Sequence, residues 1–157
     1  MFCGNVGPHY NPLDTQDPLC MSTPALIEVV DDDDDVRRML DIILQAHGFA
    51  VRLHASAQAY LNAESSAVRR VMLLDVRMPE MTGIELKALL EKRADPVPVI
   101  FMSGESLPHE TLAAKQSDAV GFLWKPFRTQ ALLSAIGQGL EVYDQRQFTH
   151  PPSRKTQ

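Results

Sequence analysis

Polar side chains that could handle phosphate chemistry follow four apolar runs in this sequence. They are the carboxylates of Asp31, Asp32 and Asp75, the hydroxyl of Ser103 and the amine of Lys125. Carboxylate oxygens are ligands that Mg²⁺ prefers, and a carboxylate can also attack phosphorus. A hydroxyl and an ammonium group both donate hydrogen bonds to phosphoryl oxygens. Together these groups would suit the transfer of a phosphoryl group with a divalent cation.

The apolar runs before these residues predict buried strands of a parallel sheet, because each run is short, continuous and bounded by turn residues. They lie at 26–30, 71–74, 97–102 and 120–124. The carboxyl ends of the strands in an open α/β sheet line one crevice. The carboxylates, the hydroxyl and the amine are therefore expected to meet there.

Helical periodicity alternates with these runs and completes the predicted fold. The first helix is expected to start from a cap at Asp34 or Asp35 and to end at Gly48. The other predicted elements are a strand at 49–54 and helices at 57–63, 84–93, 107–117 and 132–140. Five strands alternating with five helices predict an α/β fold, a doubly wound five-stranded parallel sheet. At this size the natural strand order is the flavodoxin-like 2-1-3-4-5.

The sequence of 157 residues predicts one domain between two polar ends. Residues 1–24 are rich in Pro, Gly, Asn and Asp without periodicity, and they are predicted to form a flexible leader. Residues 25–143 form the predicted domain, and 144–157 a polar tail. Met21 is an alternative translation start.

Charge and composition narrow the class of protein. The net charge of −5 argues against a nucleic-acid surface. No apolar run is long enough for a membrane span, and the first twenty residues lack the apolar core of a secretory signal. Cys3 and Cys20 are expected as reduced thiols. These features predict a cytoplasmic protein.

The residues at the strand ends resemble those of the receiver domain of response regulators in two-component signalling. The resemblance covers about residues 24–143, and its details at 77–79 and 124–127 look most like receivers of the FixJ type. It rests on the segments Val29-Val30-Asp31-Asp32, Leu74-Asp75-Val76-Arg77-Met78-Pro79-Glu80-Met81-Thr82-Gly83, Met102-Ser103-Gly104 and Lys125-Pro126-Phe127.

The resemblance implies a role for each carboxylate. Asp75 would accept the phosphoryl group as an aspartyl phosphate. Asp31 and Asp32, together with Asp75 and the backbone carbonyl of Arg77, would hold Mg²⁺, for which Mn²⁺ could substitute. The chain would then be a phosphoacceptor with Mg²⁺-dependent autophosphorylation and autodephosphorylation, and not an enzyme in the usual sense.

The same resemblance implies roles on the last two strands. Lys125 would contact a phosphoryl oxygen and precede a cis bond to Pro126. Ser103 would donate its hydroxyl to the phosphoryl group. Phe122 matches the family's aromatic switch position. Trp124, two residues later on the same side of the strand, is a hypothesised partner anchor, with simple packing as the alternative.

A departure from the family pattern at position 118 and the charges at positions 77 and 105 carry expectations of their own. Asp118 stands where relatives have Gly, and it is expected to tolerate a left-handed turn at that point. Arg77 and Glu105 lie two residues past Asp75 and Ser103. They are expected to pair over the site, obstruct hydrolysis and give a long-lived phosphorylated form.

The sequence therefore predicts a single-domain response regulator that is phosphorylated by a histidine kinase or a histidine phosphotransfer protein. FixJ-type receivers usually carry a DNA-binding domain, and too few residues follow the last predicted helix for one, so output through an unidentified protein partner is expected. A phosphate sink and a phosphorylation-independent interaction module are the alternatives. A phosphatase of the haloacid dehalogenase type needs a second acidic residue at position 77, which is Arg.

Overall fold

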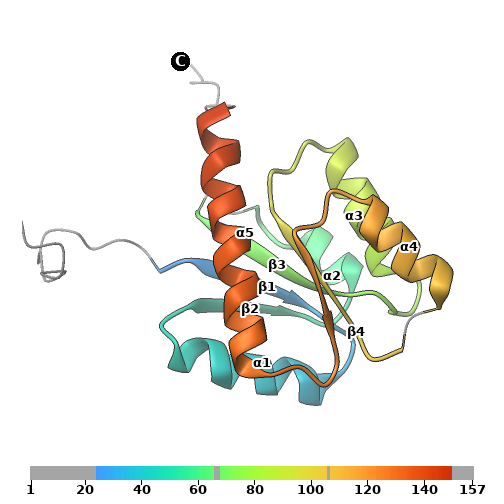
Figure 1. Ribbon diagram of the computed structural model, residues 1–157, viewed down its shortest axis with the longest axis horizontal. Helices are drawn as coiled ribbons and strands as arrows, with labels where there is room; N and C mark the ends of the chain where they lie inside the picture. The colour runs from blue at the N-terminus through green and yellow to red at the C-terminus, as the bar shows by residue number, and fades with distance from the viewer. Residues whose placement is uncertain (1–23, 66–67, 106, 150–157) are drawn as a thin grey trace, which may run out of the picture.

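The computed structural model describes residues 24–65, 68–105 and 107–149. Both cysteines, the alternative start at Met21, nearly all of the predicted leader and the end of the predicted tail lie outside these residues. The described chain forms a five-stranded parallel sheet in the order β2-β1-β3-β4-β5. This confirms the predicted doubly wound α/β fold (Figure 1).

Strands and helices alternate along the whole described chain. The strands are β1 (Leu26–Val30), β2 (Ala50–His54), β3 (Arg70–Asp75), β4 (Val99–Ser103) and β5 (Gly121–Trp124). The helices are α1 (Asp34–Ala46), α2 (Ala57–Asn62), α3 (Gly83–Lys92), α4 (Pro108–Gln116) and α5 (Thr129–Thr149). Within the described ranges, no helix is both long and apolar enough to cross a membrane.

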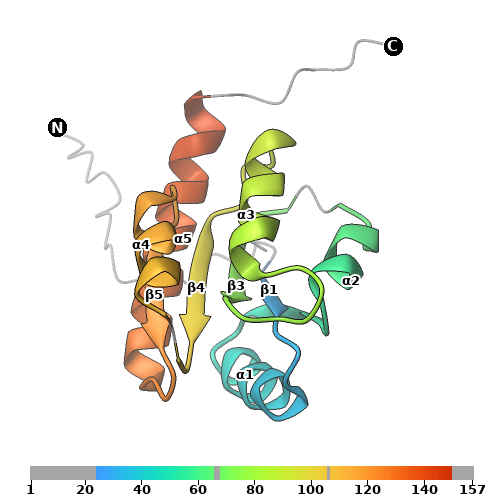
Figure 2. The same ribbon diagram turned by 90° about the vertical axis from the view of Figure 1, so that its right-hand side faces the viewer.

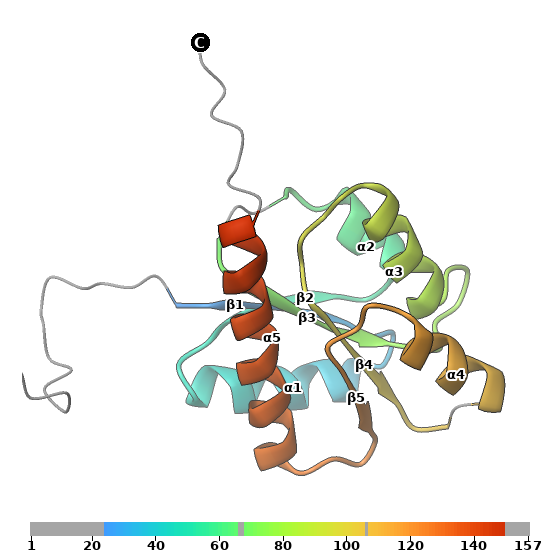
Figure 3. The same cartoon turned by 45° about the horizontal axis from the view of Figure 1, so that its top comes forward.

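The sheet has an apolar core on each face. On one face α1 and α5 pack through buried residues such as Leu44 and Ile136. On the other face α2, α3 and α4 pack through residues such as Leu86 and Ala114. Figure 3 shows these two helical layers on opposite sides of the strands. The central strands are buried on both faces, which explains why β1, β3 and β4 appear in the sequence as nearly continuous apolar runs.

The start of α1 differs from its prediction by one residue. Asp33, and not Asp34 or Asp35, is the N-cap, because its backbone is extended and its carboxylate accepts the N–H groups of Asp35 and Val36. Asp34 and Asp35 form the first turn, where the helix dipole favours negative charge. Gly48 follows the helix with a φ of 82°, as its predicted role at the helix end requires.

The last helix continues to Thr149, past the domain end predicted at residue 143. Two ion pairs hold this part of the helix: Asp144 accepts two hydrogen bonds from Arg69, and Arg146 donates to Asp118. Figure 1 shows this end of α5 standing beyond the sheet.

The expectation of a left-handed Asp118 is wrong, because its φ is not among the positive values of the described residues. Helix α4 instead ends at Gln116, its C-cap Ser117 has an extended backbone, and Asp118 accepts a hydrogen bond from Arg146.

Candidate functional site

The carboxyl ends of four strands bring the predicted site residues to one edge of the sheet. Asp31 and Asp32 follow β1, Asp75 and Ser103 end β3 and β4, and Lys125 follows β5. The backbone ladder continues past the strand ends, since Asp31 N–H donates to His54 O and Lys125 N–H donates to Ser103 O. The strand ends therefore fix where these side chains start.

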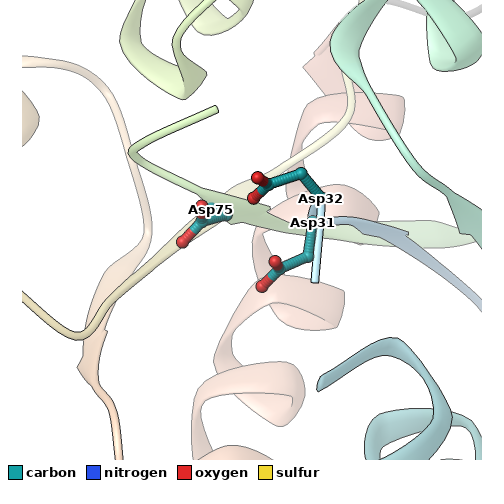
Figure 4. A group of neighbouring side chains, drawn as sticks. All are labelled: Asp31, Asp32 and Asp75. Atoms are coloured by element: carbon teal, nitrogen blue, oxygen red, sulfur yellow. The ribbon is translucent and has the colours of Figure 1, made fainter. Parts of the chain in front are cut away.

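Three carboxylates form the centre of the site. One oxygen each from Asp31, Asp32 and Asp75 lies within 4.8 Å of the other two. Figure 4 shows the three side chains close together at the strand ends. Asp31 and Asp75 are buried, whereas Asp32 is exposed. Hard oxygen ligands with one open side suit Mg²⁺, which keeps several waters and takes one or two protein carboxylates. The residues present therefore fit a divalent cation.

Hydrogen bonds hold both the side chain and the backbone carbonyl of Asp31 in place. Its Oδ1 accepts the Asp33 N–H at 3.0 Å, and its carbonyl accepts from Arg37 Nη1 at 2.7 Å. Arg37 also pairs with Asp34 in the first turn of α1. The sequence pattern does not single out Arg37, because only the fold of the β1–α1 turn brings its guanidinium back to Asp31.

Lys125 joins two of the carboxylates. Its Nζ lies 2.7 Å from Asp31 Oδ2 and 3.1 Å from Asp75 Oδ1. Burial opposes the charged form of this amine, but the hydrogen bond and charge of Asp31, aided by Asp75, outweigh it and raise the pKa of Lys125. The bond from Lys125 to Pro126 is cis, as the resemblance implies.

The surroundings of Asp75 disfavour the ionised form of its carboxyl group. Burial, and then the nearby charge of Asp31, raise the pKa of Asp75 from 3.8 to about 6, although the charge and hydrogen bond of Lys125 act in the opposite direction. A cation among the three carboxylates would relieve this repulsion. The site is therefore suited to a positively charged ligand next to the Asp75 carboxylate.

Ser103 is buried at the end of β4, and its hydroxyl donates to the carbonyl of Glu105 at 3.1 Å. Ser103 therefore ends the strand that pairs with β3, the strand that ends at Asp75. A phosphoryl oxygen on Asp75 would compete with the Glu105 carbonyl for this single donor.

Gly83 sets the distance between the site and α3. A Cβ at this position would lie 2.2 Å from the backbone oxygen of Asp75. The Gly83 N–H donates to Val76 O, and the helix is capped by Thr82, whose Oγ1 accepts the Glu85 N–H. Gly83 belongs to the family-like segment of the sequence, but its physical role, this close approach, is visible only in the fold.

The predicted pair between Arg77 and Glu105 is wrong. Arg77 Nε donates instead to Glu110 Oε2 at 3.1 Å, in the first turn of α4. Glu110 is the nearer partner because its carboxylate already turns back toward the helix start, where it accepts the Leu107 N–H at 3.0 Å. That bond, followed by the effect of Arg77, lowers the pKa of Glu110.

Phe122 and Trp124 lie together on one side of β5, as their spacing predicts, and Phe122 packs against the same core cluster as Ala114 of α4. Their ring centroids are 4.7 Å apart, and Phe122 also contacts Phe101 in the core at 6.5 Å. Phe122 is half-buried, whereas Trp124 is 51% exposed. Figure 2 shows α4, β5 and α5 together at one end of the sheet, away from α2. Trp124 is therefore an aromatic side chain available on the surface.

Sequence comparison with known proteins identifies response regulators as relatives of this chain. A protein-family model described as the response regulator receiver domain matches residues 27–137. The response regulator protein TodT of Pseudomonas putida is 33% identical over 127 residues, which cover 81% of this chain and 56% of TodT. The transcriptional regulatory protein FixJ of Rhizobium meliloti is 34% identical, over 76% of this chain and 58% of FixJ.

Solved structures agree with these sequence relatives. The crystal structure of FixJ-N has a TM-score of 0.69 and 33% identity, and it covers 74% of this chain and 94% of that one. The response regulator StyR has a TM-score of 0.71 and 35% identity, over 80% of this chain and 64% of that one. The chain spans little more than half the length of the curated relatives it matches. The chain belongs to the response regulator receiver domain family.

Proposed function

We propose that this chain accepts a phosphoryl group on Asp75 from a histidine kinase or a histidine phosphotransfer protein. The observation that carries the proposal is the position of Asp75: its carboxylate is buried at the end of β3, within 4.8 Å of two other carboxylates and 3.1 Å from Lys125 Nζ. A carboxylate that only capped a loop would need neither the two other carboxylates nor the ammonium group beside it.

The transfer itself exchanges one bond for another. An Asp75 oxygen attacks phosphorus, the P–N bond to the donor histidine breaks, and the electron pair of that bond returns to the imidazole, which takes up a proton. Lys125 now bridges two carboxylates, and in the product it would keep Asp31 and donate to a phosphoryl oxygen. Ser103 would turn its hydroxyl from Glu105 O to another phosphoryl oxygen.

A divalent cation completes the proposal. Asp31, Asp32 and Asp75 would hold Mg²⁺ with the backbone carbonyl of Arg77, and Mn²⁺ would substitute. When bound, the cation offsets the negative charge of the incoming phosphoryl group. The exposure of Asp32 leaves a side of the cluster open to solvent, so that a cation and a phosphodonor can enter.

The proposed output is a protein surface that responds to phosphorylation, centred on Phe122 and Trp124. Phe122 connects the core residue Phe101 to the exposed ring of Trp124. A change in the packing of Phe122 would therefore reach a side chain that a partner can touch. Large, half-exposed aromatic residues are frequent anchors of protein interfaces.

The test is phosphorylation by a small acyl phosphate with and without Mg²⁺, followed by intact mass measurement of wild type and Asp75→Asn. We expect one added phosphoryl group that requires both Mg²⁺ and Asp75. No gain in folded protein, and none from a panel of histidine kinases, would contradict the proposal and favour a phosphorylation-independent interaction module.

A phosphate sink is the second reading of the same chemistry. It would be phosphorylated equally well but would bind no partner more tightly afterwards. Capture of partners by the phosphorylated and unphosphorylated forms, with Trp124→Ala as a matched variant, separates a relay from a sink.

A further inference from the structure

An ion pair connects the segment after the phosphoacceptor to the start of α4. Arg77 lies two positions after Asp75, and its Nε donates to Glu110 Oε2 at 3.1 Å. The side chain of Glu110 is only 17% exposed, whereas that of Arg77 is 44% exposed. The contact therefore connects the segment that follows β3 to α4, the helix that follows β4.

The same carboxylate oxygen also caps α4. Glu110 Oε2 accepts the Leu107 N–H at 3.0 Å, and Leu107 as N-cap has no side-chain acceptor of its own. At α3, by contrast, Thr82 supplies such an acceptor for the Glu85 N–H. The first turn of α4 thus depends on Glu110, and Glu110 in turn is held by Arg77.

The rest of α4 is weakly anchored. Among residues 108–116, all within the described chain, Ala114 alone is buried. Leu112 is 55% exposed, and Leu107 at the cap is 47% exposed. Since few apolar contacts fix this helix, the polar contacts at its start matter for where it lies.

We propose that Arg77 is a positioning residue whose pair with Glu110 holds the start of α4 in its unphosphorylated position. This inference rests on the proposed function, in which Ser103 releases Glu105 O to reach a phosphoryl oxygen. Leu107 lies four positions after Ser103, so a shift at Ser103 is passed to the helix start that Glu110 caps. The pair with Arg77 opposes that shift.

An interaction made in one of two states favours that state by its own free energy. Exposed ion pairs contribute little, and the expected effect is about a two- to fivefold change in the affinity for a phosphoryl group at Asp75. Breaking the pair from either side should raise that affinity, because the resting position loses a contact that the phosphorylated position does not use.

Beryllofluoride, a stable mimic of the phosphoryl group, tests this in the full chain with saturating Mg²⁺ by titration calorimetry. The variants are Arg77→Gln, Glu110→Gln and the double variant. Glu110→Gln keeps an amide oxygen that can cap Leu107, so it removes the charge without removing the cap. Asp144→Asn is the control, since Asp144, on α5, forms a similar exposed pair with Arg69. Binding of Mg²⁺ alone is the second readout.

We expect both single variants to bind beryllofluoride about two- to fivefold more tightly. The double variant should gain no more than either single one, and Asp144→Asn should match wild type. Mg²⁺ affinity should stay within about twofold of wild type in Glu110→Gln. Weaker binding in Arg77→Gln with tighter binding in Glu110→Gln would overturn the proposal, because it would mean that Arg77 acts on the anion directly.

Unchanged affinity in both single variants would also overturn it. Failure of the proposed function would look different, because wild type itself would then bind no beryllofluoride in the presence of Mg²⁺.

Discussion

Lys125 Nζ lies 2.7 Å from Asp31 Oδ2 and 3.1 Å from Asp75 Oδ1, so one ammonium group separates two buried carboxylates that would otherwise face each other. Each of the three residues comes from a different strand end. The contact therefore connects β1, β3 and β5 across the edge of the sheet and is part of the fold as well as of the site.

Replacing Lys125 by Met should destabilise the metal-free protein by about 2 kcal/mol near neutral pH, because two buried carboxylates lose their shared counter-charge. Saturating Mg²⁺ should restore part of the loss, since the cation takes over that role. Urea unfolding with and without Mg²⁺ measures both effects. The exposed Lys92→Met is the control, and an equal loss there would contradict the assignment.

Asp75 should make stability depend on pH in a defined direction. Its pKa rises from 3.8 to about 6 on folding, so the folded protein holds the proton more tightly, and the stability contributed by the protonated form is lost as the pH rises from 3.8 to about 6. Above that window Asp75→Asn should be more stable than metal-free wild type by up to about 3 kcal/mol.

The comparison of wild type and Asp75→Asn by urea unfolding near pH 7 and near pH 4 checks this. The difference between the two proteins should become small at the lower pH, where Asp75 is protonated in the folded state and close to half protonated in the unfolded chain. Saturating Mg²⁺ near pH 7 should stabilise wild type and not the variant. An advantage of Asp75→Asn that is the same at both values would refute the raised pKa.

Asp32 should matter for the metal and little for the fold. It is exposed, and one of its carboxylate oxygens lies within 4.8 Å of oxygens of Asp31 and Asp75. Asp32→Asn should weaken Mg²⁺ binding about tenfold or more, with unfolding free energy within about 0.5 kcal/mol of wild type. Titration calorimetry measures the affinity, and the exposed Asp35→Asn in α1 should bind like wild type.

Gly83→Ala should damage both the fold and the site. The new Cβ would meet the Asp75 carbonyl oxygen at 2.2 Å, so either α3 or the backbone of Asp75 must shift. We expect a loss of about 2–3 kcal/mol and slower phosphorylation of Asp75. Gly104→Ala is the matched control, because its Cβ would meet only Lys125 Cβ, at 3.9 Å. Similar losses in both variants would argue against the close approach.

Trp124 offers an optical test of the proposed switch. It is the only Trp in the chain, and its ring packs against Phe122 at 4.7 Å between centroids. Beryllofluoride with Mg²⁺ should change its emission in wild type, because a change in the packing of Phe122 alters its surroundings. The change should be absent in Asp75→Asn. An emission spectrum that stays constant in wild type, with binding shown by calorimetry, would separate Trp124 from the switch.

The strand ends could be predicted from the sequence because burial on both faces leaves a plain apolar run in β1, β3 and β4. The acidic pair and Asp75 follow from those ends, since parallel strands share one carboxyl edge. What the pattern identifies is where each side chain starts, and for short side chains such as aspartate that is nearly where the functional group lies.

The partner of Arg77 and the end of α5 could not be predicted, because a long side chain or a helix end can reach several alternative partners. Arg77 has several acceptors within its reach, and the choice of Glu110 over Glu105 depends on the turn that begins α4. The extent of α5 depends on Arg69 and Asp118, which are far from its end in sequence. Both outcomes depend on contacts that exist only after the sheet has assembled.

Helix α4 buries little apolar surface, and this affects local unfolding of the domain. Helix α3 buries Leu86 and Leu90, whereas α4 buries only Ala114. Amide protons in α4 should therefore exchange with solvent through small local openings, while those in β1 and β3 wait for global unfolding. The part of the domain beside the proposed output surface can thus rearrange often without drawing on the stability of the sheet that holds the carboxylates in place.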